Sequence, residues 1–424
     1  MPSDAQATPK GAWGIVALLF LYMLVNFADK IVVGLAAVPI MTELALTPKQ
    51  FGWLGSSFFV LFSASAIIVG FIINRVAARW VLLALALVWA LSQFPMVGSV
   101  GFATLVVCRI ILGAGEGPAF SVAVHAVFKW FPDQRRTLPT ALLSQGSSFG
   151  IIIAVPMLNW IIVNHSWHWA FGALGLVGLI WIALWLIFGK EGPLEVRPAP
   201  GQSAERVSYL RLLTAPTFVG CVLATFGAYW ALSLGLTWFT AFLRTLGFSQ
   251  SEAGYVSILP WIVGATASIG AGAISQAMLA RGYTTRAARG VLGAAPLVIG
   301  GVMLALVPSV SAVWAQLALL IVGSGLCGAI YVVCPAMIGE FAPDAQRGAI
   351  ISIYGALYAL AGILAPVVMG NVIAGAATPL EGYMNGYRIM AGVLIVAGLA
   401  GLALMWPQSE RARLTRHALR SRPV

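Results

Sequence analysis

Long apolar segments alternate with short polar ones along the whole chain. Each apolar segment is bounded by charge, Pro or Gly, and a helix of about 20 apolar residues is enough to cross a bilayer. Six such segments lie near residues 13–38, 51–73, 80–97, 102–128, 138–163 and 169–188, and six more near 216–243, 252–278, 288–307, 312–338, 349–374 and 387–405. The pattern predicts an all-α membrane protein with twelve transmembrane helices in two groups of six.

The composition excludes a soluble protein. Of the 424 residues, 60% are apolar and 9% are charged, whereas a soluble domain has about 25% charged residues. Disordered, collagenous and disulfide-rich classes are excluded as well. The cysteines lie inside apolar segments at Cys108, Cys221, Cys327 and Cys334. Their spacing is that of neither a disulfide framework nor a metal site, so we expect small packing residues and no cofactor or metal.

One long polar interruption divides the chain. The stretch 190–213 is rich in charge, proline and glycine, and the other breaks between apolar segments are shorter. We therefore expect an N-terminal six-helix bundle at 1–189, a cytoplasmic linker at 190–215, a C-terminal six-helix bundle at 216–407 and a basic cytoplasmic tail at 408–424.

The formal net charge of +11 reflects topology. Among the 24 Lys and Arg residues, Lys49, Arg244 and Arg388 fall on one side of the expected membrane, Lys30 and Arg109 fall inside spans, and the rest fall on the other side. Short cytoplasmic loops carry the excess of positive charge in membrane proteins. We expect both termini in the cytoplasm, an inner (plasma) membrane location and no nucleic-acid partner.

The two halves repeat each other. Trp-Phe-Pro-Asp-Gln-Arg-Arg from Trp130 recurs as Phe-Ala-Pro-Asp-Ala-Gln-Arg from Phe341, which is 211 residues later. Gly70 in the loop after the second segment likewise matches Gly272 after the eighth, 202 residues later. Parallel six-helix repeats place the substrate path near the midplane, where the halves meet.

Four charges lie well inside the expected spans, Asp29 and Lys30 in the first, and Arg109 and Glu116 in the fourth. Seven residues separate Arg109 from Glu116, so both lie on one helix face, about 10 Å apart along it. Charged side chains in a membrane generally face a partner or a water-filled cavity. We expect this quartet to meet water and its pair of cations to suit an anion. The alternative is a salt-bridge network that joins the two helices structurally.

The chain resembles the major facilitator superfamily. The resemblance rests on the six-plus-six plan, Gly-x-x-x-Asn-Arg-x-x-Ala-Arg from Gly70, the Trp-Phe-Pro pattern and Arg-Ile-Ile-Leu-Gly-Ala-Gly-Glu-Gly-Pro-Ala-Phe from Arg109. Together with Asn-Phe-Ala-Asp-Lys from Asn26, the last segment is similar to the anion:cation symporter family. Members of that family generally move organic anions, mostly carboxylates, with protons.

The resemblance implies roles for the charged quartet. Asp29 and Glu116 would carry protons, Lys30 would bind the substrate carboxylate and Arg109 would modulate the two acids. The family usually has arginine where Lys30 stands, and a lysine offers a point charge in place of a planar fork. The loop motif also departs from its usual Asp at Asn74.

Aromatic and small polar residues are the other candidates for the substrate site. Few hydrogen-bonding side chains accompany them, which favours an aromatic or short monocarboxylate over a polyhydroxylated acid. The candidates are Phe27, Phe62, Gln145, Tyr229, Trp230, Trp238, Tyr331, Tyr354 and Tyr358.

These features favour a secondary active transporter that imports an organic carboxylate with protons by alternating access. A uniporter, or a proton-driven exporter of another small molecule, is the alternative on the same fold. The sequence contains no motif of an intramembrane enzyme and no nucleotide-binding loop, so we expect neither enzymatic activity nor ATP as the energy source. We expect a monomer whose partners are the anion, the proton and the lipid bilayer.

Overall fold

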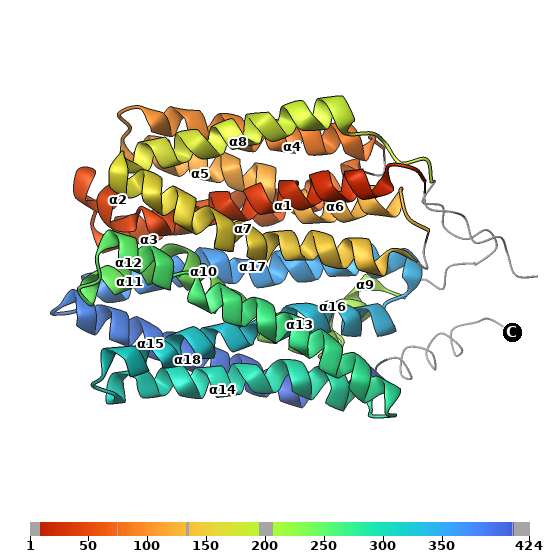
Figure 1. Ribbon diagram of the computed structural model, residues 1–424. Helices are drawn as coiled ribbons and strands as arrows, with labels where there is room; N and C mark the ends of the chain where they lie inside the picture. Colours follow the sequence, from red (N-terminus) through yellow and green to blue (C-terminus); the bar gives the residue numbers. More distant parts are fainter. Residues whose placement is uncertain (1–8, 74, 133–134, 195–206, 409, 411–424) are drawn as a thin grey trace, which may run out of the picture. The chain divides into compact units, whose positions relative to one another are not determined.

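The computed structural model describes residues 9–73, 75–132, 135–194, 207–408 and 410. The chain forms two compact units, which we describe separately (Figure 1). The amino-terminal unit comprises Met1–Pro198 and Phe248–Ile258, and the carboxy-terminal unit comprises Ala199–Gly247 and Leu259–Val424.

The described part of the amino-terminal unit is helical. Its helices are α1 (Ala12–Leu35), α2 (Ala37–Glu43), α3 (Pro48–Ile72), α4 (Ala78–Gln93), η1 (Phe94–Val97), α5 (Phe102–Glu116), α6 (Ala119–Phe128), α7 (Thr137–Asn164), α8 (Trp167–Phe188) and α12 (Gln250–Val256).

The described part of the carboxy-terminal unit is helical too. It contains α9 (Tyr209–Leu213), α10 (Pro216–Thr237), α11 (Phe239–Thr245), α13 (Leu259–Ala280), η3 (Arg286–Val291), α14 (Leu292–Leu306), η4 (Val307–Ser309), α15 (Val313–Gly325), η5 (Leu326–Ala329), α16 (Ile330–Phe341), α17 (Asp344–Ala374) and α18 (Pro379–Leu404).

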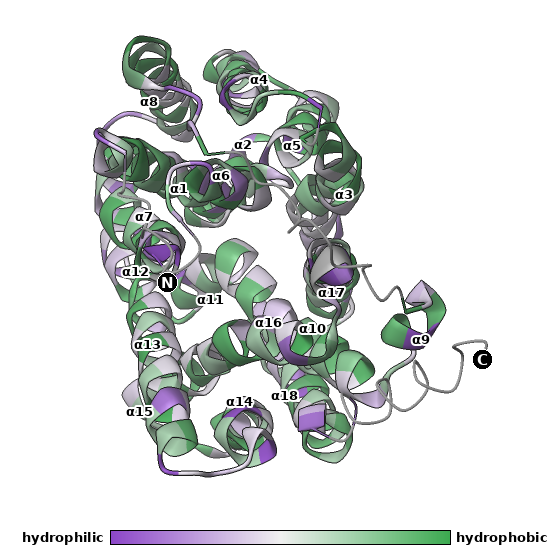
Figure 2. Ribbon diagram, turned by 90° about the vertical axis from the view of Figure 1, so that its right-hand side faces the viewer, coloured by the Kyte–Doolittle hydropathy of each residue, from purple (hydrophilic) through white to green (hydrophobic). Residues whose placement is uncertain are grey.

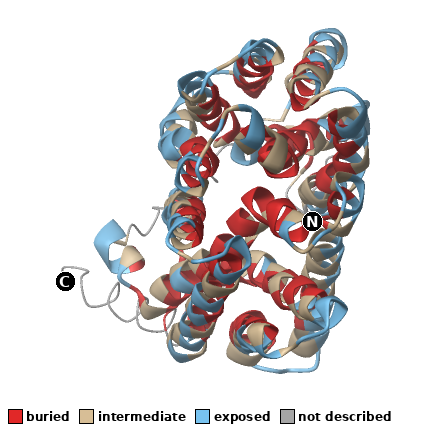
Figure 3. Ribbon diagram, turned by 90° about the vertical axis from the view of Figure 1, so that its left-hand side faces the viewer, coloured by how far each residue is buried: buried red, intermediate tan, exposed pale blue. Residues whose placement is uncertain are grey.

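The predicted membrane spans are confirmed. Among the described residues, 12 helical segments are long and apolar enough to cross a bilayer. Apolar residues run along most of the helical ribbon (Figure 2), and the buried residues gather mainly on helix sides that face neighbouring helices (Figure 3). Side chains on the outer sides are exposed even though they are apolar, as expected where hydrocarbon replaces water.

Both units pack their helices in the same pattern, which supports the predicted repeat. In the amino-terminal unit, α1 packs on α7 and α8, α3 on α5, and α4 on α8. In the carboxy-terminal unit, α10 packs on α17 and α18, α13 on α15 and η5, and α14 on α18. The main helix pairs of the first unit thus have counterparts in the second.

Several predicted spans are interrupted. The fourth breaks between α5 and α6 at Gly117 and Pro118, because proline has no N–H to continue the helical hydrogen bonds. The tenth changes to a 3-10 turn at η5, and the eighth divides into α12 and α13. The short helix α9 lies within the expected linker. Residues 195–206 of that linker, Asn74 and nearly all of the expected basic tail lie outside the described residues.

Candidate functional site

The buried charges of the amino-terminal unit lie on α1 and α5 and come together between these helices. Lys30 on α1 forms an ion pair with Glu116 on α5, with 2.7 Å between Nζ and Oε2. The same ammonium donates to the Asn26 backbone carbonyl at 3.3 Å and to the Asn26 side-chain oxygen. Asn26 precedes Lys30 by one helical turn, so the two side chains share a face of α1. Lys30 therefore has a carboxylate and a neutral amide as simultaneous partners.

Asp29 and Arg109 are joined through the Asp29 backbone. The Asp29 carboxylate accepts a hydrogen bond from the Gln93 side chain at 2.9 Å. Arg109 Nη1 donates to the Asp29 backbone carbonyl at 3.0 Å. The resemblance implies that Arg109 modulates the two acids, and this hydrogen bond holds it beside Asp29. The second oxygen of the Asp29 carboxylate has no hydrogen-bond partner among the described residues.

Aromatic rings surround the cations. The Lys30 ammonium lies 4.3 Å from the centre of the Phe27 ring and 5.8 Å from that of Phe62. The Arg109 guanidinium lies 4.8 Å from the centre of the Phe58 ring. Cations within about 6 Å of a ring centre are attracted to its face. The structure thus brings the predicted residues Phe27 and Phe62 to the charged cluster, together with Phe58.

Glycines on α5 bring the phenylalanines close. A Cβ atom at Gly113 would overlap the Phe58 carbonyl oxygen, and one at Gly117 would overlap the Phe62 carbonyl oxygen. Small residues four apart allow helix backbones to approach in this way. The close packing of α3 on α5 carries the phenylalanine side chains over the ion pair.

The charged quartet is buried in this structure. The exposed fractions are 0% for Asp29, 5% for Lys30, 2% for Arg109 and 1% for Glu116. The expectation that these side chains meet water is therefore not met in this conformation. The physical reason is that Lys30 pairs with Glu116, while Gln93 and the Asp29 backbone carbonyl contact the other two charges. The rings of α1 and α3 cover the cluster.

Gln145, another predicted site residue, is half-buried on α7 of the same unit. The hydroxyl of its neighbour Ser144 donates to the Thr140 carbonyl at 2.9 Å. That hydroxyl is therefore already used within its own helix.

Predicted residues of the carboxy-terminal unit form a tyrosine cluster. The Tyr358 ring centre lies 5.0 Å from those of Tyr229 and Tyr354, and 6.4 Å from that of Tyr331. The Tyr354 hydroxyl also hydrogen-bonds to Thr225 at 2.6 Å. The structure thus gathers the four predicted tyrosines from α10, α16 and α17.

The two predicted tryptophans have different surroundings. Trp238 is fully buried, and its indole N–H donates to the Pro366 carbonyl at 3.1 Å. Trp230 is buried too, with the Phe226 ring centre 6.1 Å away. The Trp238 indole N–H is thus already used by the backbone of α17.

Asn26 and Gln93 have no predicted role. A polar side chain one turn before Lys30 was the available signal for Asn26. For Gln93 the signal was an amide at the end of an otherwise apolar segment. Within the described residues, no group of three or more His, Cys, Asp or Glu side chains could hold a metal ion.

A sequence model of the Major Facilitator Superfamily matches residues 18–366. Among curated proteins, the chain is 27% identical to the hexuronate transporter of Bacillus subtilis (strain 168), covering 93% of this chain and 94% of that protein. It is 22% identical to the D-galactonate transporter of Escherichia coli O6:H1, covering 96% and 98%.

Solved structures share the fold. The crystal structure of a D-xylose-proton symporter has a TM-score of 0.75 at 16% identity, covering 94% of this chain and 99% of that one. A bacterial homologue of the human lysosomal transporter Spinster has a TM-score of 0.72 at 16% identity, covering 99% of this chain and all of that one.

Proposed function

The chain belongs to the Major Facilitator Superfamily, and we propose that it imports an organic carboxylate together with protons by alternating access. The observation that carries this proposal is the buried cluster of Asp29, Lys30, Arg109 and Glu116. A charged residue at the centre of a helix raises the free energy of inserting that helix into a membrane by about 3 kcal/mol. Charged residues that persist at such positions mark the pathways of substrates and ions.

The names of the relatives support an acidic substrate. Hexuronate and D-galactonate are carboxylates, and the proteins named for them match nearly the whole chain. The buried Lys30 ammonium is the cation best suited to bind such a group, because its partner Glu116 is itself a carboxylate at 2.7 Å. A substrate carboxylate can replace Glu116 there with similar chemistry.

This exchange would couple the anion to a proton. When the substrate carboxylate binds the Lys30 ammonium, Glu116 loses its counter-ion inside a buried site. An unpaired buried charge is strongly unfavourable, so a proton binds to Glu116 and neutralises it. The helices then close around a neutral acid and an ion pair. Release of the substrate restores the Lys30–Glu116 pair and expels the proton.

Asp29 is the second proton carrier in this proposal. Its carboxylate has a neutral donor in Gln93, an arrangement that suits both charged and protonated forms. Arg109 holds the backbone at Asp29 and supplies the positive charge that moderates both acids. Because the quartet is buried here, it must open to water in another conformation for this exchange.

The remaining predicted residues stay candidates for contacts with the substrate in their own units. Their rings and few hydrogen-bonding groups favour an aromatic or short monocarboxylate. In the amino-terminal unit they are Phe27, Phe62 and Gln145, and in the carboxy-terminal unit Tyr229, Trp230, Trp238, Tyr331, Tyr354 and Tyr358.

Transport in proteoliposomes tests the coupling. With an imposed pH gradient, inside alkaline, the unmodified protein is expected to accumulate a radiolabelled carboxylate found in a binding screen of glucuronate, galactonate, phenylacetate and 3-methylbutanoate. Glu116→Gln should exchange the anion across the membrane but lose accumulation. Glu381→Gln at the start of α18 is the matched control and should accumulate normally.

The same assay separates the alternatives. Accumulation that persists in Glu116→Gln, with a lowered melting temperature, would make the Lys30–Glu116 pair a structural clamp. Accumulation that follows a sodium gradient and ignores pH would assign the coupling to sodium. Equilibration without accumulation in the unmodified protein would indicate a uniporter, and outward pumping would indicate an exporter.

Lys30 is tested by binding. Stabilisation of the purified protein by the bound carboxylate should be lost in Lys30→Gln and partly recovered in Lys30→Arg, since the arginine restores the positive charge. Stabilisation of the unmodified protein by amines, with none by any acid, would overturn the anion proposal.

A further inference from the structure

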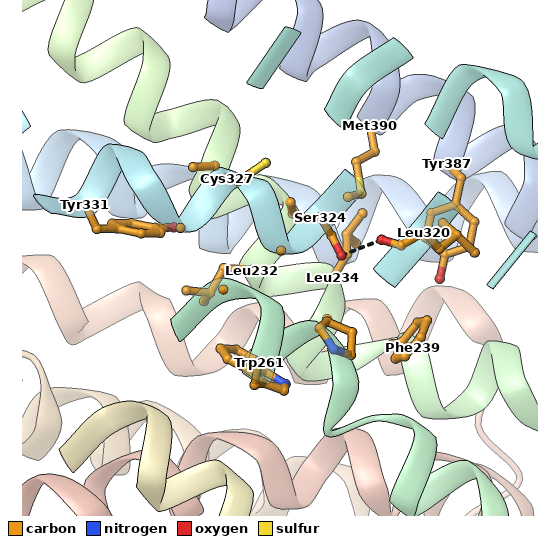
Figure 4. A pocket seen from close by; sticks show the side chains of 17 residues that line it. Leu232, Leu234, Phe239, Trp261, Leu320, Ser324, Cys327, Tyr331, Tyr387 and Met390 are labelled. Atoms are coloured by element: carbon orange, nitrogen blue, oxygen red, sulfur yellow. Dashed lines mark hydrogen bonds between the residues drawn. The ribbon is translucent and has the colours of Figure 1, made fainter. Parts of the chain in front are cut away.

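The carboxy-terminal unit contains a cavity of about 90 Å³ that no sequence argument identified. Its walls come from α10, α11, α13, α15, η5, α16 and α18. In Figure 4, Trp261 and Leu232 lie on one side and Cys327 and Ser324 on the other, while the Tyr331 and Tyr387 phenols lie toward opposite ends. None of the residues that line it is charged.

The internal repeat relates this cavity to the charged cluster of the amino-terminal unit. The offset that matches Gly70 with Gly272 carries Lys30 to Leu232. It also carries Asp29 to Ala231, the residue before it. Both Leu232 and Ala231 line the cavity.

The other offset leads to the same place. The match of Trp130 with Phe341 carries Glu116 to Cys327 and Arg109 to Leu320. Both of these residues line the cavity as well. Every charge of the quartet therefore has an apolar or thiol counterpart on the cavity wall.

Helix packing confirms this register. A Cβ atom at Gly117 would overlap the Phe62 carbonyl oxygen, and one at Gly328 would overlap the Gly264 carbonyl oxygen. The two offsets carry Gly117 to Gly328 and Phe62 to Gly264. The same backbone contact therefore occurs at equivalent positions in both units. Gly264 stands where Phe62 would place a ring, which leaves space that the first unit fills.

The cavity offers little to hold water. The Ser324 hydroxyl donates to the Leu320 carbonyl at 2.6 Å, and the Cys327 thiol donates to the Gly323 carbonyl at 3.6 Å. The Tyr331 hydroxyl is buried and has no hydrogen-bond partner among the described residues. A water molecule is well held only by two to four polar groups. Displacement of poorly held water by an apolar group favours binding.

We propose that this cavity binds the hydrocarbon tail of the transported acid, and that the substrates are monocarboxylates with an uncharged tail no larger than one ring. This inference rests on the proposed function, from which it takes the acidic substrate. A polyhydroxylated acid is disfavoured, since most of its hydroxyls would be buried against apolar side chains such as Leu232 and Met390. In this respect the chain differs from relatives named for hexuronate and D-galactonate.

The size of the cavity limits the tail. An apolar cavity of about 150 Å³ in another protein binds benzene. At about 90 Å³, this cavity holds a branched four-carbon tail directly, and a phenyl ring fits when it protrudes in part. Longer chains and fused rings would leave most of the tail outside the cavity.

Gly235→Leu tests the cavity by filling it. Gly235 lines the cavity, and a Cβ atom there meets only Trp261 Cζ2, at 3.9 Å, so the backbone tolerates a side chain. Gly392→Leu on the exposed side of α18 is the matched control, because a Cβ atom there meets nothing within 4 Å. The probes are 3-methylbutanoate, phenylacetate and glucuronate, and the readout is the dissociation constant for the full-length purified protein.

We expect the unmodified protein to bind 3-methylbutanoate and phenylacetate at least ten-fold more tightly than glucuronate. Gly235→Leu should weaken both by about ten-fold or more, whereas Gly392→Leu should not.

The failures of the two proposals are distinguishable. Tighter binding of glucuronate, or equal binding by Gly235→Leu and the unmodified protein, would overturn the cavity assignment while anion transport stands. Absence of binding for every carboxylate, in a protein that melts cooperatively, would overturn both.

Discussion

At the scale of single residues, the contact between Gln93 and Asp29 is the one whose removal is most informative. Gln93 is fully buried and donates to a carboxylate that is also fully buried. Gln93→Leu keeps the approximate volume but removes the donor, which leaves a buried acceptor unsatisfied at a cost of about 1–3 kcal/mol. We expect a lower melting temperature in detergent and a lower midpoint of unfolding in SDS. The neighbour Ser92 bonds only within its own helix at Trp89, so Ser92→Ala should change stability far less. Equal losses in the two variants would show that Gln93 contributes by packing alone.

At the scale of helices, Glu191 fixes the start of α4. It accepts hydrogen bonds from the backbone N–H groups of Ala78 at 3.3 Å and Arg79 at 2.9 Å, and it pairs with Lys129. Partial burial raises the pKa of Glu191, but the Lys129 ammonium and these N–H groups outweigh it, so the pKa lies below the usual glutamate value. A lowered carboxyl pKa stabilises the fold above the unfolded-state pKa, and this contribution is lost as the pH falls through the folded-state pKa. Glu191→Gln should therefore melt at a lower temperature than the unmodified protein at neutral pH, with a difference that shrinks in acid. A difference independent of pH would contradict this. Glu381→Gln, at an exposed position in the first turn of α18, is the control.

The same scale shows what the sequence can predict. Hydropathy along the chain identified the helices, because burial in hydrocarbon depends on each segment alone. The spacing of Arg109 and Glu116 placed both on one face, because helix geometry fixes it. The partners within the cluster were not predictable in this way. Lys30 selects Glu116 and Asp29 selects Gln93 through the rotation of three packed helices, and that rotation follows from close contacts such as Gly113 on Phe58. The cavity in the carboxy-terminal unit could not be predicted either, because it depends on how several helices pack and no single residue in the sequence marks it.

At the scale of the whole molecule, orientation in the membrane is the remaining prediction, and the two ends of α3 can test it. Lys49 lies in the first turn of α3 and Arg75 lies just beyond its last residue, Ile72, and both are exposed. A helix of 25 residues is about 37 Å long at 1.5 Å per residue, so its ends lie on opposite sides of the bilayer. The excess of Lys and Arg in the segments that we assign to the cytoplasm places Arg75 inside and Lys49 outside. In intact cells, a membrane-impermeant maleimide should label Lys49→Cys, whereas Arg75→Cys should react only after permeabilisation. The four native cysteines are buried, so the unmodified protein should give little background. The reverse labelling pattern would invert the topology, and with it the side from which the substrate reaches Lys30.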